Sequence, residues 1–450
     1  MAGQTAIDRA IDEAAQAARF WWAEPAGERV ANAVTSTIDK LRTAQKYRQD
    51  DNLMHLRLYG NAEYRSLQAE GYMQVPRDPL SDRLKYNLCA SVTDTICAKV
   101  FKNKPRPMFL TDGGDYAQQR RAQALSKFEL GIFYENGTYR LIQEHICKDA
   151  AVMGTGFLMP FRGRDNRVKH ERIFPDEIVI DDGEARWGEP RNAFRVKGVH
   201  RELLIAEFSR PEERQAIARA PALDQSQPQS GRNMILVCEA WHLPDPYTMQ
   251  GGRHVIAIKG HALLDEPWRR PGFPWAALRW YPRLLGYFGQ GTVERLRPLQ
   301  VEVNKLLMKI QEILHYHAHP AWWVPRGARF NKEALGNDLR NVYIYDGNIA
   351  PTLVTPAPVP PELYVQVDRL IQKGYDQEGV STISSSGKNP LGPNASGAAL
   401  ETFNDIESER MVLLGQAYEN FVLEISRLDQ EVMRQIDEIP HPSRPSGTLP

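Results

Sequence analysis

The amino-acid sequence predicts a mainly helical α+β protein, and two patterns along the chain carry that prediction. Helical spacing is the first: Leu88, Val92 and Ile96 recur every four residues and therefore share one face of a helix. Between residues 155 and 285 the pattern changes to short apolar runs broken by glycine, proline and aspartate, which is typical of strands and turns. Long helical stretches then return. We expect an α+β body followed by helices, of which the last is very long.

The composition is that of an ordinary soluble globular chain of 450 residues, with 42% hydrophobic and 25% charged residues. Basic and acidic residues number 56 each, so the formal net charge is zero. A protein that holds nucleic acid by charge alone is basic, so any DNA contact here is expected to be local or transient. The four cysteines form no Cys-x-x-Cys pair, which favours buried free thiols over a zinc site.

Neither end of the sequence suggests a membrane protein. No apolar run approaches the roughly 18 residues of a membrane span. The first residues lack a basic segment followed by an apolar one, the pattern of a secretion signal. We therefore expect the chain to be cytoplasmic when it is made.

Helices are predicted along most of the first 150 residues. Pro25 and Gly27 separate two of them, and Pro105 ends a third, because proline cannot continue a helix at that point. The predicted helical segments are 4–70 with this interruption, 84–101, 115–135 and 138–152. A polar linker is expected at residues 219–233, inside the β-rich section.

The C-terminal part alternates long helices with weaker elements. Leu299, Val303 and Leu306 begin a four–three repeat in a helix that runs to about residue 317, a spacing typical of helices that pack on one another. Pro298 predicts either a kink or a new helix start near Leu296. Short proline-bounded strands are expected in 318–360, a helix at 361–377, a serine- and glycine-rich loop at 378–397 and one helix at 397–437. At 1.5 Å per residue the last helix would span roughly 60 Å.

Three histidines are candidate metal ligands. His315, His317 and His319 alternate along the chain, so they would share one face if that stretch were extended. Their position at the end of a helix favours a structural role instead, since no nearby cysteine or carboxylate completes a site.

A cluster of carboxylates is likewise either a metal site or part of a turn. The stretch DEIVIDDG contains Asp176, Glu177, Asp181 and Asp182. Paired carboxylates can bind magnesium, but next to a glycine they favour a turn. We assign no catalytic residue, no metal and no cofactor from these patterns.

Two glycine clusters do not fit phosphate-binding loops. GYFGQG at 286–291 has no lysine, and in SSSGKNPLG Asn389 stands where such a loop needs serine or threonine. Pro390 also prevents the helix that would bind the phosphate. Trp322 and Trp323 offer a stacking platform for bases, but packing is favoured because neighbouring side chains of a strand point opposite ways.

Several stretches resemble the portal, or head-to-tail connector, proteins of tailed bacteriophages. YNLCASVTDTICAKVFKNKPRPMFLTDG is similar to an early helix of that family with its Lys/Pro exit. KDAAVMGTGFLMPF followed by ERIFPDEIVIDD is similar to a small-residue turn that leads into strands. GYFGQGTVERLRPLQVEVNKLLMKIQEILHYHAHPAWWVP is similar to the segment, here with Gln300 and Asn304, that enters the stem. The resemblance covers about residues 30–437 and rests on the order of these parts.

The resemblance implies an architecture and a role. Its parts would be a wing at 1–285, a stem helix at 286–317, a clip at 318–360, a second stem helix at 361–377, a channel loop at 378–397, and a long wing or crown helix with a tail at 398–450. Many members carry a further helical crown, and the short sequence after residue 439 departs from them, so no crown function is carried over. The implied role is structural and not enzymatic: a closed ring, typically a dodecamer, at one capsid vertex of the virion.

The implied partners follow from that role. They are further copies of the chain, the packaging ATPase (large terminase), tail adaptor proteins, major capsid and scaffolding proteins, and the double-stranded DNA that passes through the channel during viral DNA packaging and DNA ejection. No membrane is among them. The protein would nucleate capsid assembly, and would be found in the host cytoplasm during assembly.

Two sets of residues are expected to meet these partners. In the channel loop the polar residues are Ser384, Ser385, Ser386, Lys388, Asn389 and Asn394. One lysine per subunit gives a weak, screened and quickly exchanged phosphate contact, as suits DNA that must slide. In the clip the residues for partner docking are Trp322, Trp323, Phe330, Tyr343 and Tyr345.

Two other classes of protein stay open at this point. One is a different structural component of the virion, such as a minor head protein. The other is a metal-dependent nucleic-acid enzyme that uses His315, His317, Asp181 and Asp182.

Overall fold

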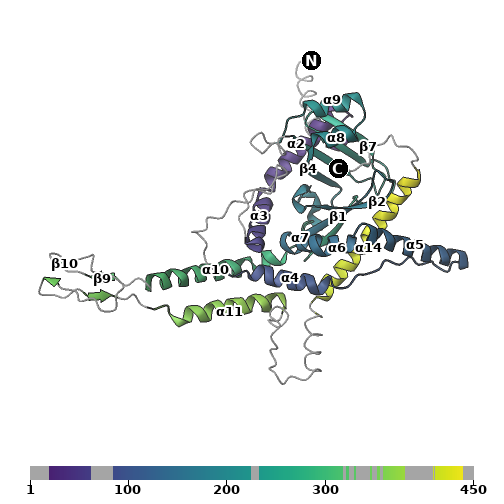
Figure 1. Ribbon diagram of the computed structural model, residues 1–450. Helices are drawn as coiled ribbons and strands as arrows, with labels where there is room; N and C mark the ends of the chain where they lie inside the picture. The colour runs from purple at the N-terminus through teal and green to yellow at the C-terminus, as the bar shows by residue number, and fades with distance from the viewer. Residues whose placement is uncertain are drawn as a thin grey trace, which may run out of the picture.

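The computed structural model describes residues 20–61, 85–223, 233–317, 358–380 and 411–438, residue 409, and four short strands between residues 321 and 354. These parts form a body of antiparallel sheets and helices (Figure 1). Two long helices, α10 and α11, extend from the body on one side, and α5 extends on the opposite side. The expectation of a mixed, mainly helical α+β protein is confirmed.

The larger sheet has five antiparallel strands in sequence order. They are β3 (Ile178–Val179), β4 (Asn192–His200), β5 (Met234–His242), β6 (Arg253–Ile258) and β7 (His261–Pro267). Val196 pairs with Cys238, which in turn pairs with Ala257, so the three side chains share one face. Helix α2 (Glu28–Ala44) covers that face with apolar residues spaced four apart, from Val30 to Val34 and Ile38. A short 3₁₀ turn (Trp21–Ala23) precedes it.

Two short helices cover one end of the opposite face. They are α8 (Arg201–Glu207) and α9 (Pro211–Arg219), inserted between β4 and β5. Leu204 and Ile217 are fully buried there against Val237 and Ile258 of the sheet. The sequence patterns did not predict these helices, because each is too short to show a long periodic stripe.

A smaller sheet of three antiparallel strands lies against the other end of that face. Its order is β2 (Val168–Ile173), β1 (Thr155–Arg162) and β8 (Ala276–Arg279). Phe157 and Met159 of β1 pack with Trp241 of the larger sheet, while Leu158 between them faces the helices. Successive side chains of a strand point to opposite faces of its sheet. Strand β1 therefore contributes to the hydrophobic core between the two sheets and to the core under the helices.

Helices form the last layer of the body. They are α3 (Lys46–Gly60), α4 (Leu88–Val100), α5 (Tyr116–Glu135), α6 (Thr138–Leu141), α7 (Cys147–Met153) and α14 (Val412–Glu438). A π-helical turn (Ile142–Ile146) joins α6 to α7 without a break. The α4, α7 and α14 segments build the largest hydrophobic cluster of the described residues. The helices predicted at 84–101, 115–135 and 138–152 are confirmed. Residues 397–408 and 410 of the long helix predicted at 397–437 lie outside the described residues.

Buried charges bridge the two sheets. Arg195 of β4 is fully buried and donates to Glu177 and Glu171, each at 2.9 Å. Lys197 also donates to Glu171, at 2.6 Å. Burial raises the pKa of Glu171, but the charges of Arg195 and Lys197 outweigh it and lower that pKa overall. The two sheets are therefore held by ion pairs as well as by aromatic packing.

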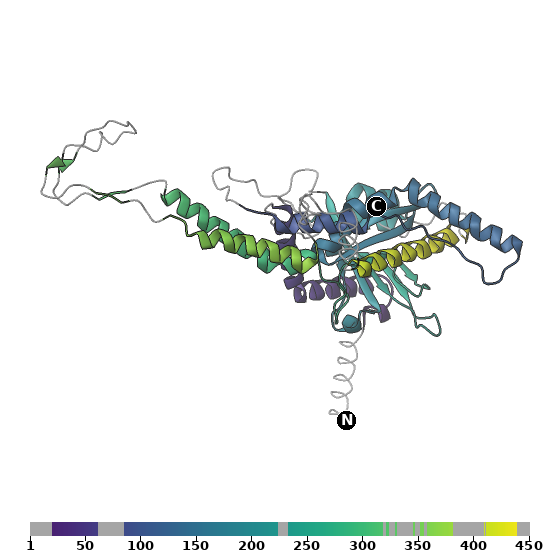
Figure 2. The same cartoon turned by 90° about the horizontal axis from the view of Figure 1, so that it is seen from below.

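The helices that leave the body are antiparallel neighbours in both views (Figures 1 and 2). They are α10 (Thr292–His317) and α11 (Pro361–Glu378). Between them lie two short strand pairs, β9 (Ala321–Trp323) with β12 (Thr352–Val354), and β10 (Arg329–Phe330) with β11 (Tyr345–Asp346). Helix α10 begins at Thr292 and contains Pro298, so a new start near Leu296 was wrong.

Two smaller predictions are also confirmed. All four cysteines are free and buried. The Asp181 carboxylate accepts a hydrogen bond of 2.8 Å from the Gly183 backbone N–H, which is the turn expected for that carboxylate cluster.

Candidate functional site: a helical hairpin anchored on the body

The most distinctive feature of the molecule is the pair of helices α10 and α11, called the hairpin below. Its seam is built from Val303 and Ile310 of α10 and from Val367 and Leu370 of α11, all buried. These residues recur at helical spacing in the sequence, so each helix turns one stripe toward the other. The two helices thus support one another where they extend beyond the body.

The hairpin is tied to the body through a buried amide. Gln300 of α10 is almost fully buried, and its side-chain oxygen accepts a hydrogen bond of 3.1 Å from the Cys89 backbone N–H at the start of α4. Its amide nitrogen donates to the Tyr86 carbonyl and to Asn304. A glutamine that satisfies both of its polar ends in this way fixes the rotation and height of α10 against α4.

A second tie joins the two helices at their base. Glu378, the last residue of α11, is buried and forms an ion pair of 3.3 Å with Arg295 of α10. Tyr281 donates to the same carboxylate at 3.3 Å and lies under the Arg295 guanidinium. Burial raises the pKa of Glu378, and Arg295 partly offsets that effect. The end of α11 therefore has a defined position on the body.

Glycines allow the body and the start of α10 to approach closely. A Cβ atom on Gly154, which has φ +89°, would lie 2.2 Å from the carbonyl oxygen of Gly289. The Gly289 backbone N–H donates to the Thr155 hydroxyl at 2.9 Å. The glycine cluster at 286–291 thus serves backbone packing, and it brings together two of the stretches on which the family resemblance rested.

Buried residues lie on both sides of the segment between α11 and α14. Helix α11 ends with Gly379 in the left-handed conformation, and the Val380 N–H bonds back to the Tyr375 carbonyl at 3.1 Å. Val380 is buried in the same hydrophobic cluster as Met411 and Leu414 at the start of α14. The described residues on both sides of the stretch 381–410 are therefore held in the hydrophobic cluster of the body, whereas the end of the loop predicted at 378–397 lies outside the described residues.

The residues predicted to contact DNA are not among those described. Ser384, Ser385, Ser386, Lys388, Asn389 and Asn394 all lie outside the described residues, in the stretch after Val380.

The residues predicted to dock partners are partly placed. Trp322 and Trp323 lie on β9, Phe330 on β10 and Tyr345 on β11, all in the segment between the two hairpin helices. Tyr343 is outside the described residues.

The structure does not bring the alternative metal ligands together. His315 and His317 lie in the last turn of α10, at the end of the hairpin that points away from the body (Figure 1). Asp181 makes its turn in the body, and Asp182 accepts a hydrogen bond from Tyr47 at 3.2 Å. Among the described parts of the chain no group of three or more histidine, cysteine, aspartate or glutamate side chains could hold a metal ion.

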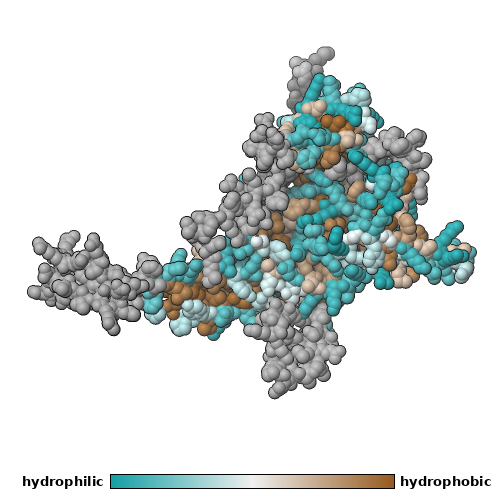
Figure 3. Space-filling model, in the orientation of Figure 1, coloured by the Kyte–Doolittle hydropathy of each residue, from teal (hydrophilic) through white to brown (hydrophobic). Residues whose placement is uncertain are grey.

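Apolar side chains remain exposed on the hairpin. Leu314 of α10 and Val365 of α11 are each 48% exposed, and Tyr364 is 45% exposed. Figure 3 shows an apolar strip over these helices, apart from the main body. A pair of helices can bury only one stripe of each, so the remaining apolar surface is available for a partner.

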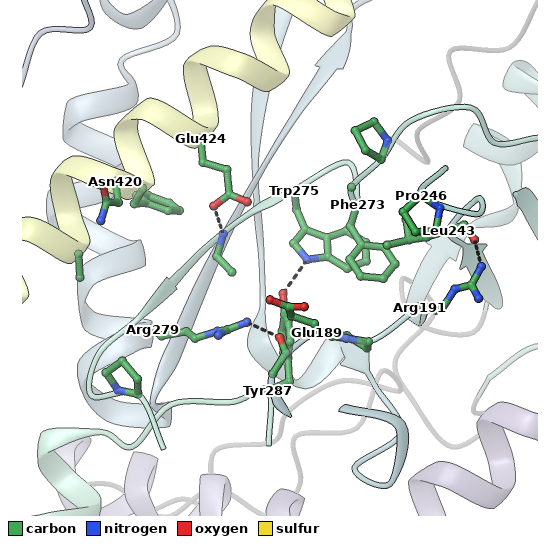
Figure 4. A pocket seen from close by; sticks show the side chains of 18 of the residues that line it. Glu189, Arg191, Leu243, Pro246, Phe273, Trp275, Arg279, Tyr287, Asn420 and Glu424 are labelled. Atoms are coloured by element: carbon green, nitrogen blue, oxygen red, sulfur yellow. Dashed lines mark hydrogen bonds between the residues drawn. The ribbon is translucent and has the colours of Figure 1, made fainter. Parts of the chain in front are cut away.

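A groove opens where α14 meets the smaller sheet (Figure 4). Its volume is about 730 Å³, which falls within the range of ligand sites. Glu424 and Asn420 of α14 form one side in this view, Phe273 and Trp275 lie at the centre, and Arg191 lies at the other side. The sequence patterns did not reveal this groove, although the prolines at 244, 246, 271 and 282 were a signal of unusual local composition.

Comparison with known proteins adds no assignment. Neither a scan against protein-family models nor a search of curated proteins finds a match. Of the helices that the structure describes, none combines the length and the apolar content that crossing a membrane requires.

Proposed function

We propose that this protein is a portal-type connector, a structural subunit that assembles into a closed ring through which double-stranded DNA passes. The observation that carries the proposal is the hairpin, which projects from an α+β body and keeps apolar residues exposed. In a ring, the hairpin of one copy packs against those of its neighbours and buries Leu314, Tyr364 and Val365. The ring would occupy one capsid vertex of a tailed bacteriophage, as the sequence resemblance implies.

The anchoring of the loop region supports a channel role. Val380, before the stretch 381–410, and Met411, after it, are both buried in one hydrophobic cluster of the body. The residues that flank this polar segment therefore have fixed positions on the body. In a ring, the segments of all copies would begin at the same level along the ring axis. Lys388 of each copy would then make a brief contact with the DNA backbone.

The zero net charge supports a conduit over a DNA-binding enzyme or regulator. A strongly basic surface would retain DNA by releasing counterions, whereas a conduit must let it slide. In this proposal the segment between α10 and α11 would dock the packaging ATPase and later the tail adaptors. The short strands β9 to β12, with Trp322 and Trp323 on β9, are where we expect that contact.

The mass of the purified particle tests the proposal. Native mass spectrometry or light scattering should give a multiple of the 51.2 kDa chain mass, close to twelve, and electron microscopy should show a ring with a central hole that admits duplex DNA. A monomer or dimer that persists at high protein concentration, with and without DNA, contradicts the proposal.

A further inference from the structure

The groove at α14 has the chemistry of a peptide-binding site. Apolar rings line it: Pro190, Pro244, Pro246, Pro271, Phe273 and Trp275. Phe273 is stacked on Trp275 with 5.1 Å between the ring centroids, and it is only partly buried, so its ring presents a flat apolar surface. Flat rings of this kind favour the rings of proline, which make a preformed extended helix of low conformational entropy.

The backbone carbonyls of the groove indicate what kind of chain it can accept. The Gly188, Leu243 and Gly272 carbonyls already accept hydrogen bonds from the side chains of Arg279, Arg191 and Trp268, respectively. An ordinary β-strand laid in the groove would therefore have to share these three carbonyls with the side chains that already use them. Proline has no N–H group, so each proline of a bound segment leaves one donor fewer to satisfy.

Charge adds a second requirement on the ligand. Two exposed carboxylates, Glu189 and Glu424, belong to the lining. The Glu424 carboxylate accepts only a long hydrogen bond of 3.4 Å from the Ala277 N–H. The basic groups of the lining are already engaged, because Arg279 donates to Gly188 and lies over the Tyr287 ring at 4.5 Å. Among the described residues neither Glu189 nor Glu424 forms an ion pair, so a basic side chain of the ligand would find a carboxylate to pair with.

The sequence after α14 has this composition. Residues 440–450 read PHPSRPSGTLP, with four prolines and one arginine, Arg444. We propose that the groove binds an extended proline-rich segment, and that its occupant is residues 440–450 of a second copy of this chain. The Arg444 guanidinium pairs with the Glu424 carboxylate.

Distance favours a second copy over the same chain. Glu424 lies 14 residues before the end of α14 at Glu438, which is roughly 21 Å along the helix. The six residues from Glu438 to Arg444 span at most about 20–22 Å when fully extended. For Arg444 of the same chain to reach Glu424, the segment would have to reverse sharply at Glu438 and run fully extended, with both side chains stretched toward one another. A neighbouring copy has no such restriction, so this part of the proposal rests on the proposed ring.

Peptide binding tests the groove independently of assembly. The probe is a fluorescein-labelled peptide of residues 439–450, and the receptor is the full chain carrying Arg444→Glu, which weakens its own segment. We expect saturable binding by anisotropy that falls about tenfold with Glu424→Ala, equivalent to the loss of about 1.4 kcal/mol. Glu419→Ala, a change to an exposed residue of α14 outside the groove, should leave binding unchanged. Absence of binding, or equal loss in both variants, overturns the proposal whether or not rings form.

Cross-linking tests the second copy. Chains with Asn420→Cys and chains with Ser443→Cys are co-expressed and oxidised, against a low background because the native cysteines are buried. A disulfide-linked dimer in the mixture, and in neither variant alone, supports binding between copies. If the peptide binds but the mixture gives no dimer, or if the double variant links only within one chain, the second copy is the wrong occupant. Particle mass, measured on the same samples, shows separately whether a ring has formed.

Discussion

Glu129 should make the stability of the protein fall as pH rises. This residue of α5 is fully buried, and Ser426 and Asp429 of α14 are its polar neighbours. Asp429 of α14 lies beside it and is itself hydrogen-bonded to His170 at 2.8 Å, while the other ring nitrogen of His170 bonds to Thr138 at 2.6 Å. Burial, and then the charge of Asp429, raise the pKa of Glu129 to about 8.

The size of the effect follows from linkage. In the unfolded chain this pKa is 4.5, so between pH 4.5 and 8 the folded state binds a proton that the unfolded state has released. Stability is fully present below pH 4.5 and decreases up to pH 8. The difference of 3.5 pKa units sets an upper limit of about 5 kcal/mol. We expect about 1–3 kcal/mol, because α5 can shift and admit water to the ionised group.

Glu129→Gln removes the titrating group and keeps the shape. At pH 8.5 the variant should be more stable than the parent by about 1–3 kcal/mol, and at pH 4.5 the two should agree within about 0.5 kcal/mol. Urea unfolding followed by tryptophan fluorescence, with amide hydrogen exchange of α5, measures both. Glu135→Gln is the matched control on the same helix, since that carboxylate is exposed and pairs with Arg167 at the surface. The reasoning is refuted if Glu129→Gln has the same pH dependence as the parent.

Three further predictions concern the sheets, the hairpin base and assembly. Arg195→Leu should lower the free energy of unfolding by about 3–5 kcal/mol, because Glu171 and Glu177 are left without their buried partner. A loss below about 1 kcal/mol, measured by urea unfolding, would contradict the stabilising role of these ion pairs. Gly154→Ala should lower the free energy of unfolding by at least about 3 kcal/mol, because its Cβ meets the Gly289 carbonyl. Gly131→Ala in α5 meets nothing and should be neutral or slightly stabilising. Val365→Glu should prevent ring formation at a cost of about 3 kcal/mol per interface without unfolding the subunit. Gln366→Glu adds the same charge one residue away as a control, and rings of normal mass from both variants would exclude α11 from the interface.

Local pattern in the sequence was enough to predict much of the secondary structure. Helix α4 at Leu88–Val100 and helix α11 at Pro361–Glu378 lie within about four residues of their predicted limits. The turn at Asp181 and the burial of the four cysteines were also correct. These features depend on residues a few positions apart, whose spacing or side-chain chemistry can be read directly. The short helices α8 and α9 were missed because nine residues or fewer show too little periodicity.

The ties that hold the hairpin and the body could not be predicted in the same way. Gln300 and Cys89 are 211 residues apart in sequence, and His170 and Asp429 are 259 apart. No local pattern pairs such residues, because their proximity arises only when the sheets and helices pack. The sequence by itself determined most of the longer helices, the position of the β-rich section, the neutral charge and the order of these parts. Only the tertiary structure decided that the glycine cluster before α10 serves close packing, that Glu129 is buried beside another carboxylate, and that a proline-lined groove lies against α14, since each depends on backbones distant in sequence meeting within a few ångströms.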